Sequence, residues 1–173
     1  QMNKAYAKAT DNAVIAAFTA SGTAATGVAA TAAGLQSFIA TESAAAFKAT
    51  SDYASNLVVS TDQWAAIMGY ADSTGRPLYT AANPANNPGA VGGQSIRGQI
   101  LGTDLYVDPN IATTGVVDES AFLVAPDAVT VYESPTTRLQ VNVIGSGQVE
   151  VGVYGYLAIA VKKAGGVRRF NLT

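Results

Sequence analysis

The sequence contains no cysteine and no histidine among its 173 residues. Without cysteine the chain can form no disulfide and offers no thiolate as a nucleophile or metal ligand. Without histidine it lacks the commonest general base and the usual zinc ligand. Most enzyme classes are therefore disfavoured, because only carboxylates, lysines, tyrosines and serines remain as candidates for catalysis.

Charged residues are also few. Asp, Glu, Lys and Arg make up 13% of the chain, against roughly 25% in a typical soluble domain. Much of the surface must therefore consist of Ala, Gly, Ser, Thr and Asn. Such a surface suits a subunit that packs against neighbours, since charge is depleted at the centres of protein interfaces. A merely alanine-rich composition explains the same number equally well.

Long apolar runs are absent as well. No stretch is long enough to span a bilayer as a helix, so we predict no membrane partner. The opening residues, Gln1-Met2-Asn3-Lys4, are followed by no apolar segment with a cleavage site. The sequence therefore shows no compartment signal, and its length suits one domain or two small subdomains.

The first part of the chain is predicted to be helical. Apolar residues that recur every three or four positions predict helices over Lys4–Phe18, Leu35–Ala49 and Thr61–Tyr70. Between the first two, Thr19–Gly34 is rich in Ala, Thr and Gly, and we interpret it as mostly loop.

The third predicted helix has a recognisable start. Ser60 and Gln63 have the spacing of a capping box, in which each side chain can satisfy a backbone N–H of the other. Three apolar residues then recur at helical spacing and are expected to face the core: Trp64, Ile67 and Met68.

From Gln94 onward the sequence is predicted to be mostly β. A short strand over Asn56–Val59 precedes this part, and Thr80–Gly93, rich in Pro, Gly and Asn, is interpreted as a long loop. Helices first and strands later, without βαβ alternation, indicate an α+β fold. Four strands are predicted before the final hairpin: Ser95–Leu101, Asp104–Val107, Ala121–Ala125 and Val129–Tyr132.

The last strands are predicted to form a hairpin. In Arg138–Val143 and again in Val149–Val153, apolar residues alternate with polar residues or glycine, and Gly145-Ser146-Gly147 supplies the turn. This alternation is typical of a hairpin with one buried face. The second strand is expected to continue over Tyr154–Val161. Three tyrosines of this region are interpreted as core or interface residues: Tyr132, Tyr154 and Tyr156.

Acidic pairs are the best candidates for chemistry. Asp104 and Asp108 flank a predicted strand, and Asp118 and Glu119 are adjacent in a predicted loop. Two carboxylates in different environments could do acid–base work. However, Asp-Pro-Asn and Asp-Glu are ordinary turn sequences, and the chain lacks the Asp-x-Asp-x-Asp-Gly calcium loop. We therefore predict no catalytic residue, no metal ligand and no small-molecule substrate.

Glycine-rich segments give no nucleotide signature. The sequence GTAATG at Gly22–Gly27 lacks the Gly-Lys-Ser/Thr ending of a phosphate loop, and the glycines of the predicted hairpin do not open a helix. A serine nucleophile would need lysine as its base, and nothing places a lysine beside a serine. No cofactor is predicted, and the chain is not predicted to be an enzyme.

The basic end of the chain is the candidate for contact with nucleic acid. Residues 1–150 hold all 12 acidic residues and six of the ten basic ones, a net charge of −6, whereas the last 23 residues hold four basic residues and no acid. A solvated strand end, or pairing with acids of a neighbouring subunit, accounts for them more simply than stacking on bases. Four residues could make weak contact with DNA: Lys162, Lys163, Arg168 and Arg169.

The most informative stretch is Val58–Tyr79, VVSTDQWAAIMGYADSTGRPLY. It reads as a strand, a Ser/Thr cap, a helix with Trp64 and then Asp-x-x-Gly-Arg-Pro-Leu-Tyr. This order resembles the major capsid proteins of tailed bacteriophages, which share the Hong Kong 97-type fold with encapsulin shells. SIRGQILGTDLYVDP at Ser95–Pro109 and SAFLV at Ser120–Val124 are similar to later strands of that family. The likeness extends over nearly the whole chain and is weakest between residues 19 and 34.

The resemblance implies a Hong Kong 97-type α+β fold with an axial domain and part of a peripheral domain. Residues 1–18 would be the end of the spine helix in the peripheral domain, and 19–128 would be the axial domain, which gathers around symmetry axes. Residues 129–173 would be a β segment that returns to the peripheral domain. The family's N-terminal arm, extended loop and most of its spine helix have no counterpart here. We therefore expect the sequence to be the C-terminal portion of a longer protein.

The function that the resemblance implies is structural. Identical subunits, in hexamers and pentamers, would assemble in the bacterial host cytoplasm into an icosahedral shell that encloses a phage genome, and the protein would be found in the virion. Three alternatives stay open: an encapsulin-type compartment that houses a cargo enzyme, a surface carbohydrate- or cell-binding module, and a hydrolase that uses paired carboxylates.

Overall fold

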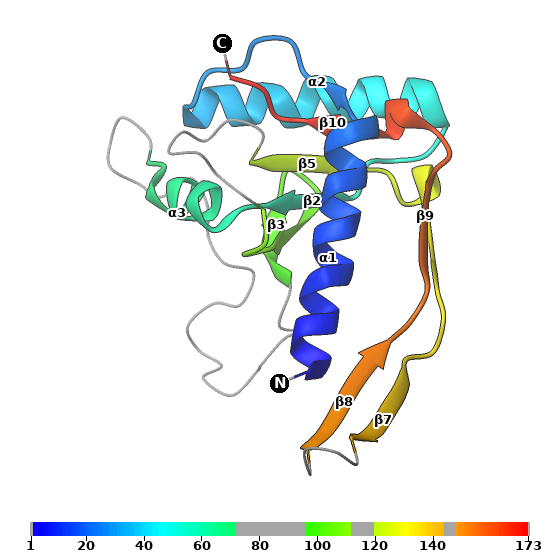
Figure 1. Cartoon of the computed structure of the whole chain (residues 1–173). Helices are drawn as coiled ribbons and strands as arrows, with labels where there is room; N and C mark the ends of the chain where they lie inside the picture. Colours follow the sequence, from blue (N-terminus) through cyan, green and yellow to red (C-terminus); the bar gives the residue numbers. More distant parts are fainter. Residues whose placement is uncertain (1, 72–95, 112–119, 144–147, 173) are drawn as a thin grey trace.

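The computed structural model describes residues 2–71, 96–111, 120–143 and 148–172. Its helices are α1 (Met2–Ser21), α2 (Ala32–Thr50) and α3 (Thr61–Gly69). None of the helices in these residues is both long and apolar enough to cross a membrane. Figure 1 shows α2 lying along the top of the body and α1 crossing it at a steep angle. Three predicted features lie outside the described residues: the loop Thr80–Gly93, the acids Asp118 and Glu119, and the turn Gly145-Ser146-Gly147.

A six-stranded mixed sheet forms the body. In spatial order its strands are β1 (Thr23–Ala24), β10 (Val167–Arg169), β5 (Ala121–Val124), β2 (Asn56–Val59), β4 (Thr103–Val107) and β3 (Ile96–Ile100). The pairs β1–β10 and β2–β4 are parallel, and the other pairs are antiparallel. The α+β class predicted from the sequence is confirmed, and β2 has the bounds that the sequence predicted.

The core lies between this sheet and the two longer helices. All four residues of β5 are buried, as expected for a strand covered on both faces. Phe38 of α2 packs edge-on against Phe170 with ring centroids 5.2 Å apart, and Phe18 of α1 packs against Phe122 at 5.9 Å. Such aromatic pairs contribute about 0.5–1.5 kcal/mol beyond their buried area, so they help to hold both helices on the sheet.

The predicted capping box of α3 is half right. Ser60 is the N-cap, and its Oγ accepts a hydrogen bond from the Gln63 N–H at 3.1 Å. The Ser60 N–H instead donates to the Ser120 carbonyl, and Gln63 Oε1 accepts from Ser120 Oγ at 3.1 Å. The residue before β5 therefore replaces the second half of the capping box, which ties the start of α3 to the central strand.

Two other predictions need correction. The loop predicted over Thr19–Gly34 is shorter, because α1 continues to Ser21, β1 pairs with the distant β10, and α2 begins at Ala32. In α3, Ile67 is buried and Trp64 packs against the core, whereas Met68 is exposed. The sheet covers only a narrow strip of this short helix, and Met68 lies outside that strip.

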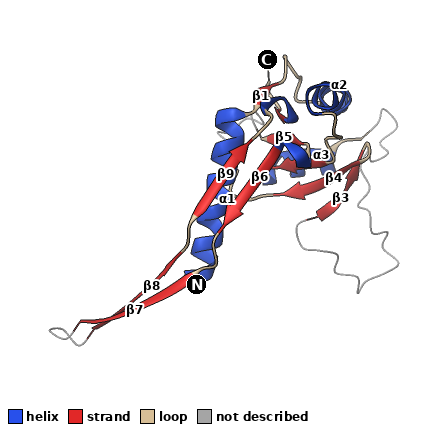
Figure 2. Ribbon diagram, turned by 90° about the vertical axis from the view of Figure 1, so that its right-hand side faces the viewer, coloured by secondary structure: helices blue, strands red, loops and turns tan. Residues whose placement is uncertain are grey.

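The remaining strands form a two-stranded ribbon, residues 129–143 and 148–161, that projects from the body. β6 (Val129–Glu133) pairs with β9 (Leu157–Val161), and β7 (Thr137–Val143) pairs with β8 (Gln148–Tyr154), both antiparallel. Figures 1 and 2 show the two pairs as successive parts of one arm that extends past the sheet beside α1. The 3-10 helices η1 (Pro126–Ala128) and η2 (Ala164–Gly166) join its base to the body.

The predicted hairpin is confirmed as β7–β8, but the strand predicted to continue over Tyr154–Val161 is interrupted. The register explains the break, since Glu133 lies opposite Leu157 whereas Thr137 lies opposite the last residue of β8. One strand therefore has an extra residue between the two pairs, near Pro135, which cannot donate to the ladder. After this irregularity the returning strand changes its partner from β7 to β6.

Strand β10 brings the end of the chain back to the body. It belongs to the segment 129–173 that the sequence assigned to a peripheral domain, yet it pairs with β5 from the segment 19–128. The chain thus leaves the sheet to make the ribbon and then returns. The division into residues 1–18, 19–128 and 129–173 stays a prediction.

The turn between β3 and β4 holds backbone strain. Leu101 has φ 49° and Gly102 has φ 82°, which is the geometry of a two-residue hairpin turn that favours Asn-Gly. Leu101 is 61% exposed, so its side chain gains little by burial. We expect Leu101→Asn to raise the free energy of unfolding by about 1 kcal/mol, measured in urea, because asparagine tolerates the left-handed region. Gly102→Ala should lower it, and identical urea midpoints for the two variants would contradict the assignment of strain.

Candidate self-association surface

The solvent exposure of residues alternates along the second strand of the ribbon, which runs through β8 and β9. From Val151 to Val161, even-numbered residues are exposed and odd-numbered residues are half-buried, with no change of phase at the break between β8 and β9. Successive side chains of an extended strand point to opposite faces. One continuous face, called here the outer face, therefore carries Tyr154, Tyr156 and Ala158.

The other strand of the ribbon completes the outer face. Tyr132 lies opposite Ala158, and Leu139 lies opposite Gly152, and directly paired residues share a face. The rings of Tyr154 and Tyr156 meet edge-on with centroids 6.5 Å apart. The large side chains of this face are 59% exposed at Tyr132, 53% at Leu139, 47% at Tyr154 and 77% at Tyr156. These values exclude the core as the place of the three tyrosines, and their place in an interface stays a prediction.

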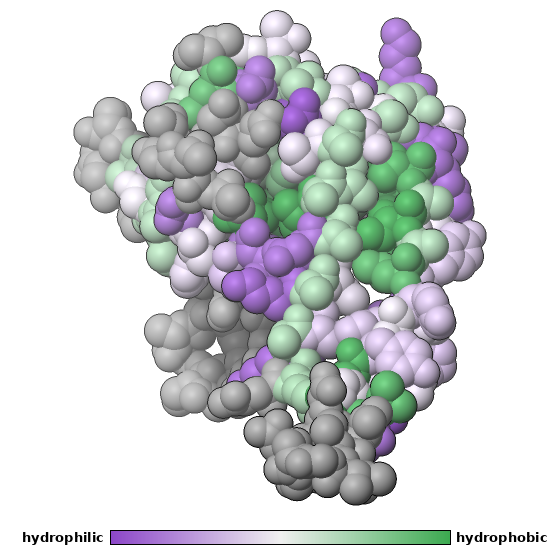
Figure 3. Space-filling model, in the orientation of Figure 1, coloured by the Kyte–Doolittle hydropathy of each residue, from purple (hydrophilic) through white to green (hydrophobic). Residues whose placement is uncertain are grey.

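The opposite, inner face of the ribbon meets α1. Gly155 lies against the Tyr6 ring so closely that a Cβ at this position would overlap Tyr6 Oη. Leu157 and Ile159 of the same face are half-buried. Figure 3 shows a strongly apolar patch beside α1, in the region where Figure 1 draws β9. The ribbon thus has apolar side chains on both faces, and α1 covers part of one.

Negative charge gathers where α1 meets the ribbon. Burial raises the pKa of the Tyr6 phenol above its ordinary value, and the Glu133 carboxylate raises it further. Burial also raises the pKa of the Asp11 carboxyl, with smaller contributions from the negative charges of Asp108 and Glu133. The ionised Asp11 carboxylate is therefore destabilised at this contact at neutral pH, whereas the neutral Tyr6 phenol is not.

The charge of Asp11 gives the stability a dependence on pH. A carboxyl whose pKa is higher in the folded than in the unfolded state destabilises the fold above the folded pKa, and this effect disappears below the unfolded pKa. We expect Asp11→Asn to unfold at a higher temperature than the unsubstituted chain at about pH 7, and at the same temperature near pH 3. Thermal unfolding at both pH values tests this. Equal stabilisation at both would show that the effect does not come from the charge.

The close contact between Gly155 and Tyr6 can be tested by substitution. Gly155→Ala should lower the free energy of unfolding by about 1–2 kcal/mol, because the new methyl group must displace the Tyr6 ring. Gly152→Ala is the matched control on the same strand, since no atom lies within 4 Å of its added Cβ. Urea unfolding should show partial recovery when Tyr6→Phe removes the overlapping oxygen from the Gly155→Ala chain. Equal losses for the two glycine variants would contradict this packing.

The acids predicted as a pair do not come together. Asp104 in β4 and Asp108 just past its end are about 13 Å apart along an extended strand. Asp104 Oδ1 accepts a hydrogen bond from Gln99 Nε2 at 2.7 Å, and Asp108 Oδ1 accepts one from the Asn110 N–H at 2.8 Å. Asp108 therefore closes a turn. Within the described ranges, no group of three or more acidic side chains is placed to hold a metal ion.

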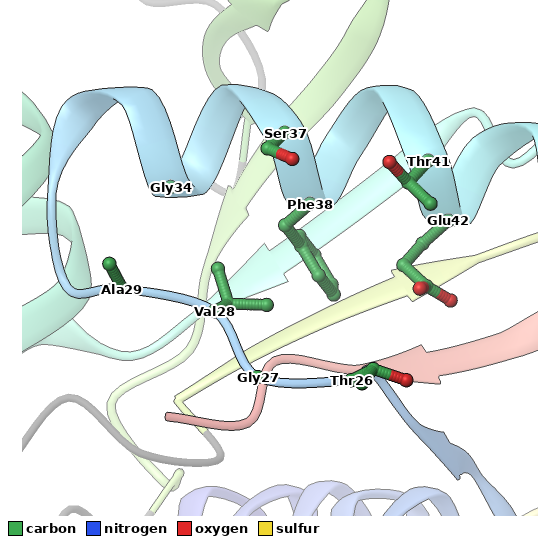
Figure 4. A pocket seen from close by; sticks show the side chains of 9 residues that line it. All are labelled: Thr26, Gly27, Val28, Ala29, Gly34, Ser37, Phe38, Thr41 and Glu42. Atoms are coloured by element: carbon green, nitrogen blue, oxygen red, sulfur yellow. The ribbon is translucent and has the colours of Figure 1, made fainter. Parts of the chain in front are cut away.

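A pocket of about 190 Å³ lies between α2 and the segment Thr26–Ala29. Figure 4 shows apolar and hydroxyl side chains around it, with Glu42 as its acidic member. Glu42 Oε2 lies 3.5 Å from Arg168 Nη1, so a cation of the chain itself compensates the charge. With one carboxylate already paired and no second reactive group in its wall, the pocket has the character of a packing gap, and we assign it no ligand.

The basic residues near the end of the chain contact partners within the chain. Arg168 pairs with Glu42, and its Nε donates to the Gly165 carbonyl at 2.9 Å. Lys163 Nζ donates to the Thr50 carbonyl at 2.8 Å. The prediction of a solvated end is therefore wrong for Arg168, which is only 15% exposed beside Glu42, whereas Lys163 is exposed as predicted. Pairing with a neighbour's acids stays a prediction. DNA contact through Lys162, Lys163, Arg168 and Arg169 stays a prediction.

The sequence matches a known protein family. The sequence matches the model of the family described as phage capsid protein over residues 1–169. None of the curated proteins matches it.

Solved structures share the fold. A structure from Mycobacterium phage Che8 is 20% identical, with a TM-score of 0.74, and the match covers 98% of this chain and 60% of that one. A structure from Gordonia phage Cozz is 14% identical, with a TM-score of 0.51 over 90% of this chain and 51% of that one. The capsid of a native GTA particle computed with C5 symmetry is 12% identical, with a TM-score of 0.52 over 68% of this chain and 37% of that one. The chain thus spans about 60% of the length of the Che8 chain.

Proposed function

This chain belongs to the phage capsid protein family, and from that membership we propose that it is a major capsid subunit of the Hong Kong 97 type. Identical copies would form hexamers and pentamers and close into an icosahedral shell around a phage genome, with assembly in the host cytoplasm. The observation that carries the proposal is the family match, which covers residues 1–169. The role of the chain is then structural and the place of the protein is the virion.

The fold and the surface support this proposal. The likeness to the Che8 structure includes 98% of the chain, so the sheet, α1 and the ribbon all take part in it. The GTA capsid was computed with C5 symmetry, which accords with subunits of this fold in five-membered rings. Closed rings of identical subunits require surfaces that meet without repulsion, and only 13% of the residues are charged.

The domain division can now be proposed from contacts. The sheet with α2 and α3, residues 19–128, would be the axial domain, and the pairing of β10 with β5 supports adding residues 167–169 to it. Residues 1–18 of α1 together with the ribbon would be the peripheral domain, since Tyr6 packs on Gly155. In this arrangement the axial part meets neighbours around a symmetry axis, and the arm reaches away from it.

Electron microscopy of the natural protein tests the proposal. Negative-stain micrographs should show closed shells or the rings from which shells are built, and analytical ultracentrifugation should show large, concentration-dependent assemblies. Strictly monomeric protein over a hundredfold range of concentration would overturn it. Shells that contain a cargo enzyme instead of DNA would favour the encapsulin alternative.

A further inference from the structure

We infer that the outer face of the ribbon, formed by Tyr132, Leu139, Tyr154 and Tyr156, is a contact surface for a second copy of this chain. The inference rests on the proposed function and deepens it, because it names a surface through which copies meet. It concerns the face that points away from α1.

The outer face of the ribbon lacks cover in the described part of the chain. A two-stranded sheet is marginally stable in water unless a helix or further strands pack on it. α1 contacts the inner face through Tyr6, whereas the four large side chains of the outer face remain between 47% and 77% exposed. Among the described residues, nothing buries this face. A ribbon with apolar side chains on both faces, of which α1 covers part of one, is completed by packing against another molecule.

The exposed side chains of the outer face also have the chemistry of an interface. Tyrosine is enriched at protein interfaces because its ring gives a large contact area at low cost in conformational entropy, while its hydroxyl stays compatible with water. Tyr154 and Tyr156 already meet edge-on at 6.5 Å. This contact restricts both rings before binding, so less freedom is lost when a partner arrives.

The charge of the outer face identifies the partner. By register, its residues within 130–139 and 152–160 are tyrosine, leucine, threonine, alanine and glycine, and Glu150, which pairs with Val141, follows farther along the same alternation. Glu133 pairs with Leu157 and Arg138 pairs with Val153 on the inner face. A surface for nucleic acid needs lysine or arginine to neutralise phosphates, and the outer face presents neither in the described side chains. Around the tyrosines the face carries no charged residue, so this part can instead meet an identical face, or another uncharged face of a second copy, without repulsion.

The exposed area sets the strength of the contact. The three tyrosines present on the order of 350 Å² of exposed ring surface, since a tyrosine buries about 200 Å² when covered completely. A stable pair of proteins needs about 800 Å² from each partner. Contact through this face is therefore weak between two isolated chains, and it becomes effective when other contacts in a closed ring hold the copies together.

The first experiment compares two variants of the natural full chain. In Tyr132→Ser/Tyr156→Ser the outer face loses two of its rings, and we expect the concentration needed for assembly to rise at least tenfold in ultracentrifugation. The temperature of unfolding should stay the same, because both side chains are exposed. Tyr53→Ser is the control, since Tyr53 is 74% exposed but lies on the body. Equal assembly of the double variant and the unsubstituted chain, or an equal defect in the control, would overturn the inference.

The second experiment identifies what the face touches. Benzoylphenylalanine in place of Tyr156 should, on irradiation of assembled particles, give a product with twice the mass of the chain. A cross-link to DNA or to a host protein, or no cross-link in assembled particles, would overturn the inference. If the protein forms no shells, the proposed function fails, and the same photoreaction in concentrated soluble protein still decides whether copies meet through this face.

Discussion

Replacing Glu42 with alanine should lower the free energy of unfolding by about 3–5 kcal/mol, because it leaves the Arg168 guanidinium buried without a counter-charge. Glu42 Oε2 lies 3.5 Å from Arg168 Nη1, and the two side chains are only 12% and 15% exposed. Arg168 cannot readily turn to solvent, since its Nε also donates to the Gly165 carbonyl at 2.9 Å. Urea unfolding followed by circular dichroism measures the loss.

Two variants separate this effect from ordinary side-chain loss. Asp127→Ala removes the partner of Lys163 in an exposed pair at 3.8 Å, with side chains 42% and 73% exposed, and should cost less than about 1 kcal/mol. Glu42→Leu/Arg168→Leu removes both buried charges and should recover most of the stability lost in Glu42→Ala. A Glu42→Ala chain as stable as the Asp127→Ala chain would show that the buried pair does not hold α2 to β10.

This pair changes the interpretation of the basic end. In the sequence, Arg168 belongs to a stretch of four bases without an acid, which favours a solvated end or pairing with a neighbour's acids and leaves weak contact with DNA open. In the structure its partner comes from the middle of α2, far away in the chain. Local charge counts cannot find such a pair, because Glu42 stands alone among apolar and small residues of a helix.

Elements with strong local signals were predictable. Asn56–Val59 is a strand between a loop and a helix cap, and its bounds are confirmed. Ser60 begins α3 because its side chain satisfies the Gln63 N–H. By contrast, β1 and β10 have two and three residues, and each exists because of pairing across most of the chain. Propensity within such short segments carries too little information to reveal them.

The outer face of the ribbon was only half predictable. The alternation of valines in β8 indicated a hairpin with one buried face. Tyr154 and Tyr156 occupy the other set of positions, so both sets are apolar, and the sequence cannot say which set α1 covers. Gly155, between the two tyrosines, has no side chain because the Tyr6 ring approaches the strand there. A glycine at this position therefore indicates that α1 covers the face of Gly155 and not the face of the two tyrosines.

Replacing Gly166 with alanine should have the second large effect, a loss of about 2–3 kcal/mol of unfolding free energy together with impaired assembly. Gly166 lies in η2 at the base of the ribbon, where an added Cβ would be 2.5 Å from Ala128 Cβ and 2.6 Å from Thr50 Cγ2. Its N–H donates to the Lys163 carbonyl, and its carbonyl accepts from the Ala125 N–H at 2.8 Å. A buried residue bonded on both sides cannot shift, so the overlap forces apart the elements that hold the ribbon to the body.

Two comparisons decide whether this base is packed as closely as the geometry requires. Gly69→Ala, at the end of α3, has no atom within 4 Å of the added Cβ and should leave stability unchanged or slightly raised, because alanine favours the helix. Ala128→Gly in the Gly166→Ala chain removes the methyl group that blocks the new one, and should recover part of both stability and assembly. If the Gly166→Ala/Ala128→Gly chain regains stability but not assembly, the position of the ribbon does not explain the assembly defect. That result would contradict a role of the ribbon in assembly. A Gly166→Ala chain that unfolds with the same urea midpoint as Gly69→Ala would contradict the close packing itself.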